Sequence, residues 1–165
     1  MSDKKSEPIG RVYIAFVITV MFVAPGICTA IEFVTSGTDN AMAVIGKWFV
    51  FWAIGIRLLV AGIRQTLNPA FTAKDIFEIE DEKSYPIVRE LGFSNLCSGL
   101  AAVISLYVPA WRITAAFIGG LYMGIAGINH AIRKPTGGNE LVAMISDLFI
   151  LVVMTVYIAN SMLAK

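Results

Sequence analysis

Residues 48–64, WFVFWAIGIRLLVAGIR, decide the fold, because this run is long and apolar enough to cross a bilayer yet carries an arginine at its middle. Trp48 and Trp52 are typical of interface anchors at one end of such a span. Arg57 lies about midway between Trp48 and Arg64. A charge at the bilayer midplane costs on the order of 3 kcal/mol, so Arg57 is expected to face protein, with an acidic partner from another span.

Four more apolar runs flank this one, and together they predict a single all-α domain, a polytopic helical membrane bundle with about five transmembrane helices. The composition agrees, since 57% of the 165 residues are hydrophobic and the mean hydropathy is +0.74. The first run is interpreted as a retained helix and not as a cleaved signal peptide. The predicted helices cover residues 12–33, 48–64, 91–108, 113–130 and 141–162.

Basic residues divide unequally between the two sides of this topology, which predicts an N-in, C-out orientation in the cytoplasmic membrane. Residues 65–90, with an acidic cluster, then form a cytoplasmic connecting segment. The inner side receives Lys4, Lys5, Arg11, Arg64, Lys74, Lys83, Arg89, Arg133 and Lys134, and the outer side receives Lys47, Arg112 and Lys165.

Asp147 is the partner expected for Arg57, because it lies about 9 Å into the fifth span from the cytoplasmic side, within reach of a long arginine side chain. Arg64 lies on the same helical face as Arg57. Glu140 is better placed for Arg64, with Glu90 as a competitor. The Arg57–Asp147 pair either locks two helices together or takes part in ligand binding, and both alternatives stay open.

Polar residues of four spans are expected to converge in the cytoplasmic half of the bundle and to form a ligand-binding pocket. The arginines would bind an anionic group, and the amide side chains would orient it. The candidate ligand-binding residues are Arg57, Arg64, Gln65, Glu90, Asn95, Asn129, His130, Glu140 and Asp147.

The fourth span contains a GxxxG pattern at Gly120 and Gly124, which is typical of close helix packing. This pattern either packs within the bundle or docks a membrane partner or a second copy of the chain. Cys28 and Cys97 stand alone without CxxC spacing, so neither a metal site nor another cofactor is expected. The net charge of +1 predicts no nucleic-acid partner.

Three stretches carry a resemblance to known sequences: Gly55-Ile56-Arg57 through Ala61-Gly62-Ile63-Arg64-Gln65, Arg89-Glu90-Leu91-Gly92-Phe93-Ser94-Asn95, and Gly127-Ile128-Asn129-His130. They resemble a family of uncharacterised small bacterial multi-pass membrane proteins. More loosely, the chain is similar to DoxX-like proteins, which are associated with quinone-linked oxidation or thiol stress. The resemblance implies a compact helical membrane protein and brings no known activity.

The leading functional hypothesis is therefore a membrane protein that binds or passes a small anionic or amphipathic molecule through the polar pocket. One alternative is an enzyme or quinone-linked oxidoreductase subunit that uses His130 with Glu90 or Asp147 for proton transfer. No haem-ligand pair, nucleotide loop or metal-ligand cluster supports that alternative. The other alternative is a scaffolding or accessory membrane subunit.

Overall fold

The computed structural model describes residues 10–37, 40–77, 79–133 and 138–163, and in these residues the chain forms helices and no strands. Five helical stretches are long and apolar enough to cross a membrane. They are Arg11–Ser36, Ala41–Leu67, Glu82–Ile104, Pro109–Arg133 and Glu140–Leu163.

The first two stretches are each interrupted by a π-helical segment, whereas the last three are mainly α-helical. The first consists of α1 (Arg11–Ile18), η1 (Thr19–Val23) and α2 (Ala24–Ser36). The second consists of α3 (Ala41–Phe49), η2 (Val50–Ile56) and α4 (Arg57–Leu67). The others are α6 (Tyr85–Ile104), α7 (Arg112–Arg133) and α8 (Gly138–Leu163), with 3-10 turns at η4 (Glu82–Ser84) and η5 (Pro109–Trp111).

Local sequence signals explain where several helices begin and end. The Asn40 side chain accepts a hydrogen bond from the Ala43 backbone N–H at 3.0 Å, so α3 starts well before residue 48 of the expected span. Gly37 ends α2 in the left-handed conformation, with φ of +55°. Pro86 occupies the first turn of α6, which starts before residue 91. The sequence Arg133-Lys134-Pro135-Thr136-Gly137-Gly138 predicts a turn after the fourth span, but residues 134–137 lie outside the described residues.

The segment between the second and third spans is partly helical. It contains the short helix α5 (Pro69–Phe71) and the π-helical turn η3 (Thr72–Ile76). The Asn68 side chain caps α5 by accepting a hydrogen bond from the Phe71 backbone N–H at 3.4 Å. This short element turns back over the end of α4.

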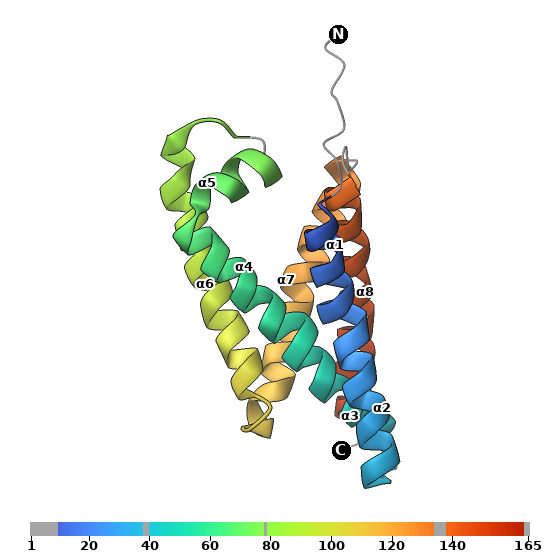
Figure 1. Ribbon diagram of the computed structural model, residues 1–165. Helices are drawn as coiled ribbons and strands as arrows, with labels where there is room; N and C mark the ends of the chain where they lie inside the picture. The colour runs from blue at the N-terminus through green and yellow to red at the C-terminus, as the bar shows by residue number, and fades with distance from the viewer. Residues whose placement is uncertain (1–9, 38–39, 78, 134–137, 164–165) are drawn as a thin grey trace.

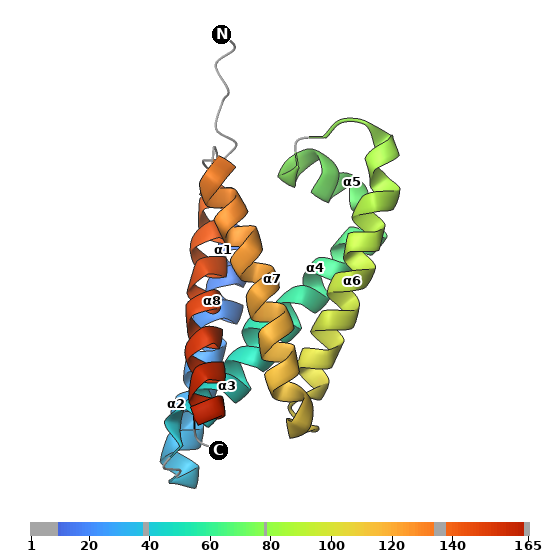
Figure 2. The ribbon, with the colours of Figure 1, turned by 180° about the vertical axis from the view of Figure 1, so that it is seen from behind.

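The helices form two arms that meet at one end of the molecule and diverge toward the other (Figures 1 and 2). The first arm consists of α4, α5 and α6, and the second consists of α1, α2, α7 and α8. The continuous helix α3–η2–α4 joins them, because α3 packs on α2 and α8 whereas α4 packs on α6. We call the diverging end the α5 end and the opposite end, where α2 finishes, the Glu32 end.

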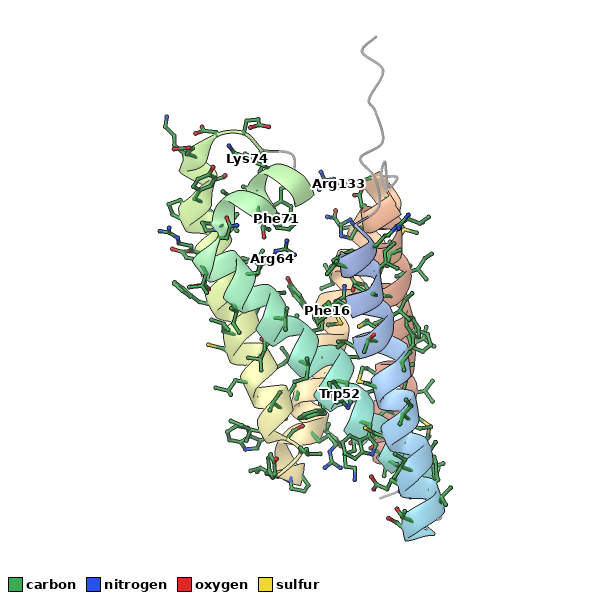
Figure 3. All side chains as sticks on the ribbon, viewed as in Figure 1. Phe16, Trp52, Arg64, Phe71, Lys74 and Arg133 are labelled. Atoms are coloured by element: carbon green, nitrogen blue, oxygen red, sulfur yellow. The ribbon has the colours of Figure 1, made fainter. Side chains whose placement is uncertain are left out.

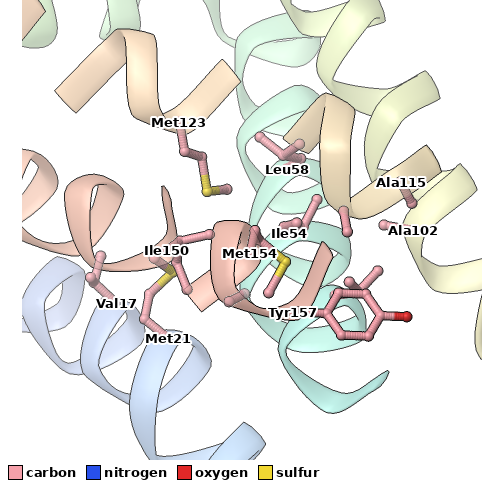
Figure 4. Close-up of a cluster of buried hydrophobic side chains, with 13 residues drawn as sticks. Val17, Met21, Ile54, Leu58, Ala102, Ala115, Met123, Ile150, Met154 and Tyr157 are labelled. Carbon is pink, nitrogen blue, oxygen red and sulfur yellow. The ribbon is translucent and has the colours of Figure 1, made fainter. Parts of the chain in front are cut away.

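The hydrophobic core lies where the arms meet, and each of the five spans contributes to it (Figure 4). Met21 from η1, Ile54 from η2, Met123 from α7 and Ile150 from α8 are all almost completely buried there. Large apolar side chains elsewhere are exposed, among them Val34. Apolar outer surfaces on helices of this length are expected where lipid, and not water, is the solvent.

Candidate functional site

The ion pair predicted between Arg57 and Asp147 is present where the two arms separate. Arg57 Nη1 lies 2.6 Å from Asp147 Oδ1, and the side chains are only 13% and 7% exposed. The same guanidinium nitrogen donates to Met21 Sδ and to Ser146 Oγ, both at 3.3 Å. Arg57 on α4 is therefore connected to η1 and to α8, and the pair joins the first arm to the second.

Both π-helical segments of the spans lie beside this ion pair. Met21 belongs to η1, and Arg57 directly follows η2. The two segments pack against each other. A π-helical turn shifts the side chains that follow it relative to a regular α-helix, and such turns are frequent at functional sites. The wider turns therefore set the direction in which Arg57 leaves the second span.

Tyr13 on α1 belongs to the same polar group, although the sequence interpretation did not include it. Its hydroxyl is close enough to interact electrostatically with Arg57 and Asp147. The sequence feature that could have identified Tyr13 was its position at the start of the first span, on the side where the other polar residues gather. An isolated tyrosine at a span end is more commonly an interface anchor, which is why the pattern alone did not identify it.

A second polar contact joins the two helices of the first arm. The Asn95 amide nitrogen donates a 2.7 Å hydrogen bond to Gln65 Oε1, and Asn95 is 3% exposed. The Tyr122 side chain on α7 interacts with Asn95 and lies within electrostatic reach of Asp147. The structure thus brings together Gln65 and Asn95, as expected, and adds Tyr122 beside Asn95.

Glu140 pairs with His130, and the expectation that it pairs with Arg64 is wrong. His130 Nδ1 lies 3.1 Å from Glu140 Oε1, a contact that joins the end of α7 to the start of α8. The Arg64 guanidinium instead stacks on the Phe71 ring, 3.4 Å from its centroid. The physical reason is the divergence of the arms, which carries the end of α4 away from α8.

Glu90 and Asn129 remain outside these contacts. Both side chains are exposed, and within the described part of the chain Glu90 forms no ion pair with Arg64. Arg64 is also exposed. Figure 3 shows Arg64 and Phe71 on the first arm, with Phe16 and Arg133 on the second.

The glycines of the GxxxG pattern pack inside the chain. A methyl group at Gly120 would approach Met154, and one at Gly124 would approach Leu151, both on α8. A partner that docks on α7 would therefore use another face of this helix. A second set of close contacts was not expected from the sequence: Gly62 and Gly99 bring the backbones of α4 and α6 together.

Two cavities, both widely open at the surface, lie toward the Glu32 end, away from the predicted pocket. One, of about 450 Å³, is lined by residues of α2 and α3 that include Cys28, Glu32, Lys47 and Trp48. The other, of about 300 Å³, lies between α6 and α7 beside Trp111.

The residues that the structure describes contain no group of three His, Cys, Asp or Glu side chains placed to hold a metal ion.

The five apolar helices with a polar junction inside them define a class, the multi-pass helical membrane proteins. Within that class, the chain belongs to the family of unknown function DUF6790, whose family model matches residues 14–164. No curated protein and no solved structure matches the chain. The family match agrees with the expected uncharacterised family, while a bacterial source and the DoxX-like similarity remain predictions.

Proposed function

We propose that this protein is an integral protein of the cytoplasmic membrane that binds a small anionic or amphipathic molecule between its arms at the α5 end. The ligand carries its negative charge to Arg64 and its apolar part along the aromatic side chains nearby. The Arg57–Asp147 pair lies deeper and holds the arms at their point of divergence.

The observation that carries this proposal is the environment of the Arg64 side chain. Its guanidinium is exposed, stacks on Phe71 and, among the described residues, pairs with no carboxylate. A guanidinium held flat by an aromatic ring keeps its N–H groups at the edge available for a carboxylate or phosphate. Arg133 on the second arm adds another exposed cation at this end.

The orientation proposed is N-in, C-out, which places the α5 end in the cytoplasm. Six basic residues of the described chain lie at the α5 end and two at the Glu32 end, and positive loops are retained in the cytoplasm. Lys4, Lys5, Lys134 and Lys165, which the sequence count also used, lie outside the described residues. The six are Arg11, Arg64, Lys74, Lys83, Arg89 and Arg133, and the two are Lys47 and Arg112.

Binding of oleate, with oleyl alcohol as the uncharged counterpart, tests the proposal. We expect oleate to raise the thermal unfolding temperature of the detergent-purified protein and oleyl alcohol to have little effect. Arg64→Ala should weaken the oleate response about tenfold, because one charge-assisted contact is lost. Thermal unfolding is a better readout than tryptophan fluorescence, since Trp48 lines a cavity with Glu32, Trp111 lies in η5, and Trp52 lies below Arg64 in Figure 3, all away from the α5 end.

Arg89→Ala provides the matched control, because Arg89 is also an exposed arginine near the start of α6. It should leave the oleate response unchanged. Equal responses of the wild type, Arg64→Ala and Arg89→Ala would refute the role of Arg64. An equal response to oleate and oleyl alcohol would refute recognition of an anionic group.

The position of His130 favours a second candidate, a quinone-linked membrane enzyme. The imidazole contacts Glu140 and lies within electrostatic reach of Asp147, so it could exchange a proton with a bound quinone. Extraction of the purified protein should then yield a quinone detectable by chromatography. The His130→Gln variant should retain less of it, and a wild type without quinone would count against the enzyme.

A further inference from the structure

The cavity at the Glu32 end contains an ion pair that is accessible from outside. The Lys47 ammonium on α3 contacts the Glu32 carboxylate on α2, and both side chains are 22% exposed. Trp48 Nε1 donates a 2.7 Å hydrogen bond to Glu32 Oε2, and the Lys47 ammonium lies 4.8 Å from the centre of the Trp48 ring. All three residues line the cavity of about 450 Å³.

The cavity also borders an apolar surface. Ile31 lines it, and Ile27, one turn earlier on the same face of α2, is 55% exposed. Trp48 marks the level at which apolar and polar surroundings meet, since tryptophan is enriched at membrane interfaces. One wall of the cavity therefore offers paired charges, and the adjoining surface suits a hydrocarbon chain.

We propose that this cavity binds the headgroup of a phospholipid with a primary ammonium, such as phosphatidylethanolamine. The lipid ammonium donates hydrogen bonds to Glu32 in place of Lys47, and the released Lys47 binds the lipid phosphate. The headgroup carries one positive and one negative charge, so both members of the ion pair are again neutralised. The acyl chain lies along Ile27 and Ile31. This inference does not depend on the proposed function, which concerns the opposite end.

The chemistry of the two charges predicts selectivity among lipids. A choline headgroup has no N–H to donate, so it cannot replace the hydrogen bonds of Lys47 at Glu32. Phosphatidylglycerol lacks the ammonium, so it offers no N–H group of its own that could take the place of Lys47 at Glu32. The positive charge of Arg112, which is close enough to act on Glu32, further favours a ligand that includes a phosphate.

Lipid titrations followed by native mass spectrometry test this selectivity on the full-length protein. Phosphatidylethanolamine should bind about tenfold more tightly than phosphatidylcholine or phosphatidylglycerol of the same acyl chains. Glu32→Gln should abolish the preference. Glu80→Gln removes a carboxylate that is 85% exposed at the α5 end, and it should keep the preference. Equal binding of the three lipids, or a preference that survives in Glu32→Gln, would overturn the proposal.

Thiol alkylation locates the bound lipid without any substitution. Cys28 lines the cavity, whereas Cys97 is an exposed thiol on α6 and serves as the internal reference. Phosphatidylethanolamine in nanodiscs of phosphatidylglycerol should slow alkylation of Cys28 several-fold relative to Cys97. Soluble glycerophosphoethanolamine, which lacks acyl chains, should protect Cys28 only at far higher concentration. Equal protection by the soluble compound would overturn the lipid as the ligand, and an unprotected Cys28 would overturn the site.

Discussion

The α4–α6 pair and the α7–α8 pair both depend on glycine, but the glycines have different neighbours. Between α4 and α6, Gly62 and Gly99 face backbone: a methyl group at Gly99 would lie 2.6 Å from the Leu59 nitrogen, and one at Gly62 would lie 2.7 Å from the Gly92 carbonyl oxygen. Between α7 and α8 they face side chains: a methyl group at Gly124 would lie 2.6 Å from Leu151 Cδ1. The first interface brings backbones together, and the second accommodates large side chains.

Because of this difference, we expect the two arms to differ in rigidity. Backbone contacts cannot move aside unless the helices move, so α4 and α6 should behave as one rigid unit. A leucine end can change rotamer, so the α7–α8 interface should tolerate an added methyl group at Gly124. A methyl group at Gly120 would lie 2.7 Å from Met154 Cβ, which a rotamer change cannot move, so this tolerance is expected at Gly124 alone. The two units are connected by the α3–η2–α4 helix, by the core at the Glu32 end and by the Arg57–Asp147 pair.

The largest loss of unfolding free energy is expected from breaking the Arg57–Asp147 pair, which connects the arms. Arg57→Ala should lower the free energy of unfolding by about 3–5 kcal/mol, because Asp147 is left as a buried charge without its partner. Unfolding of the detergent-purified protein by increasing fractions of dodecyl sulfate measures this loss. The double variant Arg57→Ala/Asp147→Ala should be more stable than Arg57→Ala. A double variant that is even less stable would show that the two charges do not compensate each other.

The next largest effect should come from the backbone contacts of the first arm. Gly99→Ala should cost about 1–3 kcal/mol, because the added methyl group meets the Leu59 nitrogen and forces α4 and α6 apart. The same unfolding assay measures the loss. Gly26→Ala is the matched control, since nothing lies within 4 Å of a methyl group placed there. Equal stability of the two variants would contradict the rigid backbone interface.

A smaller effect is expected at the polar contact within the first arm. Asn95→Leu should destabilise the protein by about 1 kcal/mol, because it removes the hydrogen bond to Gln65 and leaves that amide oxygen without its donor. A double-mutant cycle with Gln65→Leu measures the coupling between the two side chains. A coupling of zero would mean that the contact contributes nothing to the α4–α6 interface.

Hydropathy and charge were sufficient to predict the five helices and the Arg57–Asp147 pair. The span lengths follow from apolar run lengths, and a buried arginine requires a carboxylate at similar depth, of which the fifth span offers Asp147. Gln65 and Asn95 were also correctly placed in one region, because both lie at the same end of neighbouring antiparallel spans. These features depend only on depth in the membrane and on residue type.

The divergence of the arms was not predictable from the same signals. It coincides with the π-helical segments and with the backbone contacts of Gly62 and Gly99, and neither changes the hydropathy profile. The assignment of Glu140 to Arg64 failed for this reason, since it assumed parallel spans at equal spacing. The seven-residue separation between Gly92 and Gly99, matched by Gly55 and Gly62, was the available signal for the α4–α6 interface.

The smallest loss of unfolding free energy is expected in the second arm. It tests most directly whether the α7–α8 interface is less rigid than the α4–α6 interface. Gly124→Ala adds the same methyl group as Gly99→Ala at a similar distance from its nearest neighbour, but here the neighbour is the end of the Leu151 side chain. A rotamer change of Leu151 can relieve the contact, so we expect a loss below about 1 kcal/mol in the same unfolding assay. Leu151→Ala, which removes the obstructing side chain, should make the further change Gly124→Ala nearly neutral. If Gly124→Ala is as damaging as Gly99→Ala, and remains so beside Leu151→Ala, then α7 and α8 are held as rigidly as α4 and α6. The arms would then be mechanically equivalent, and the expected difference in rigidity between them would be wrong.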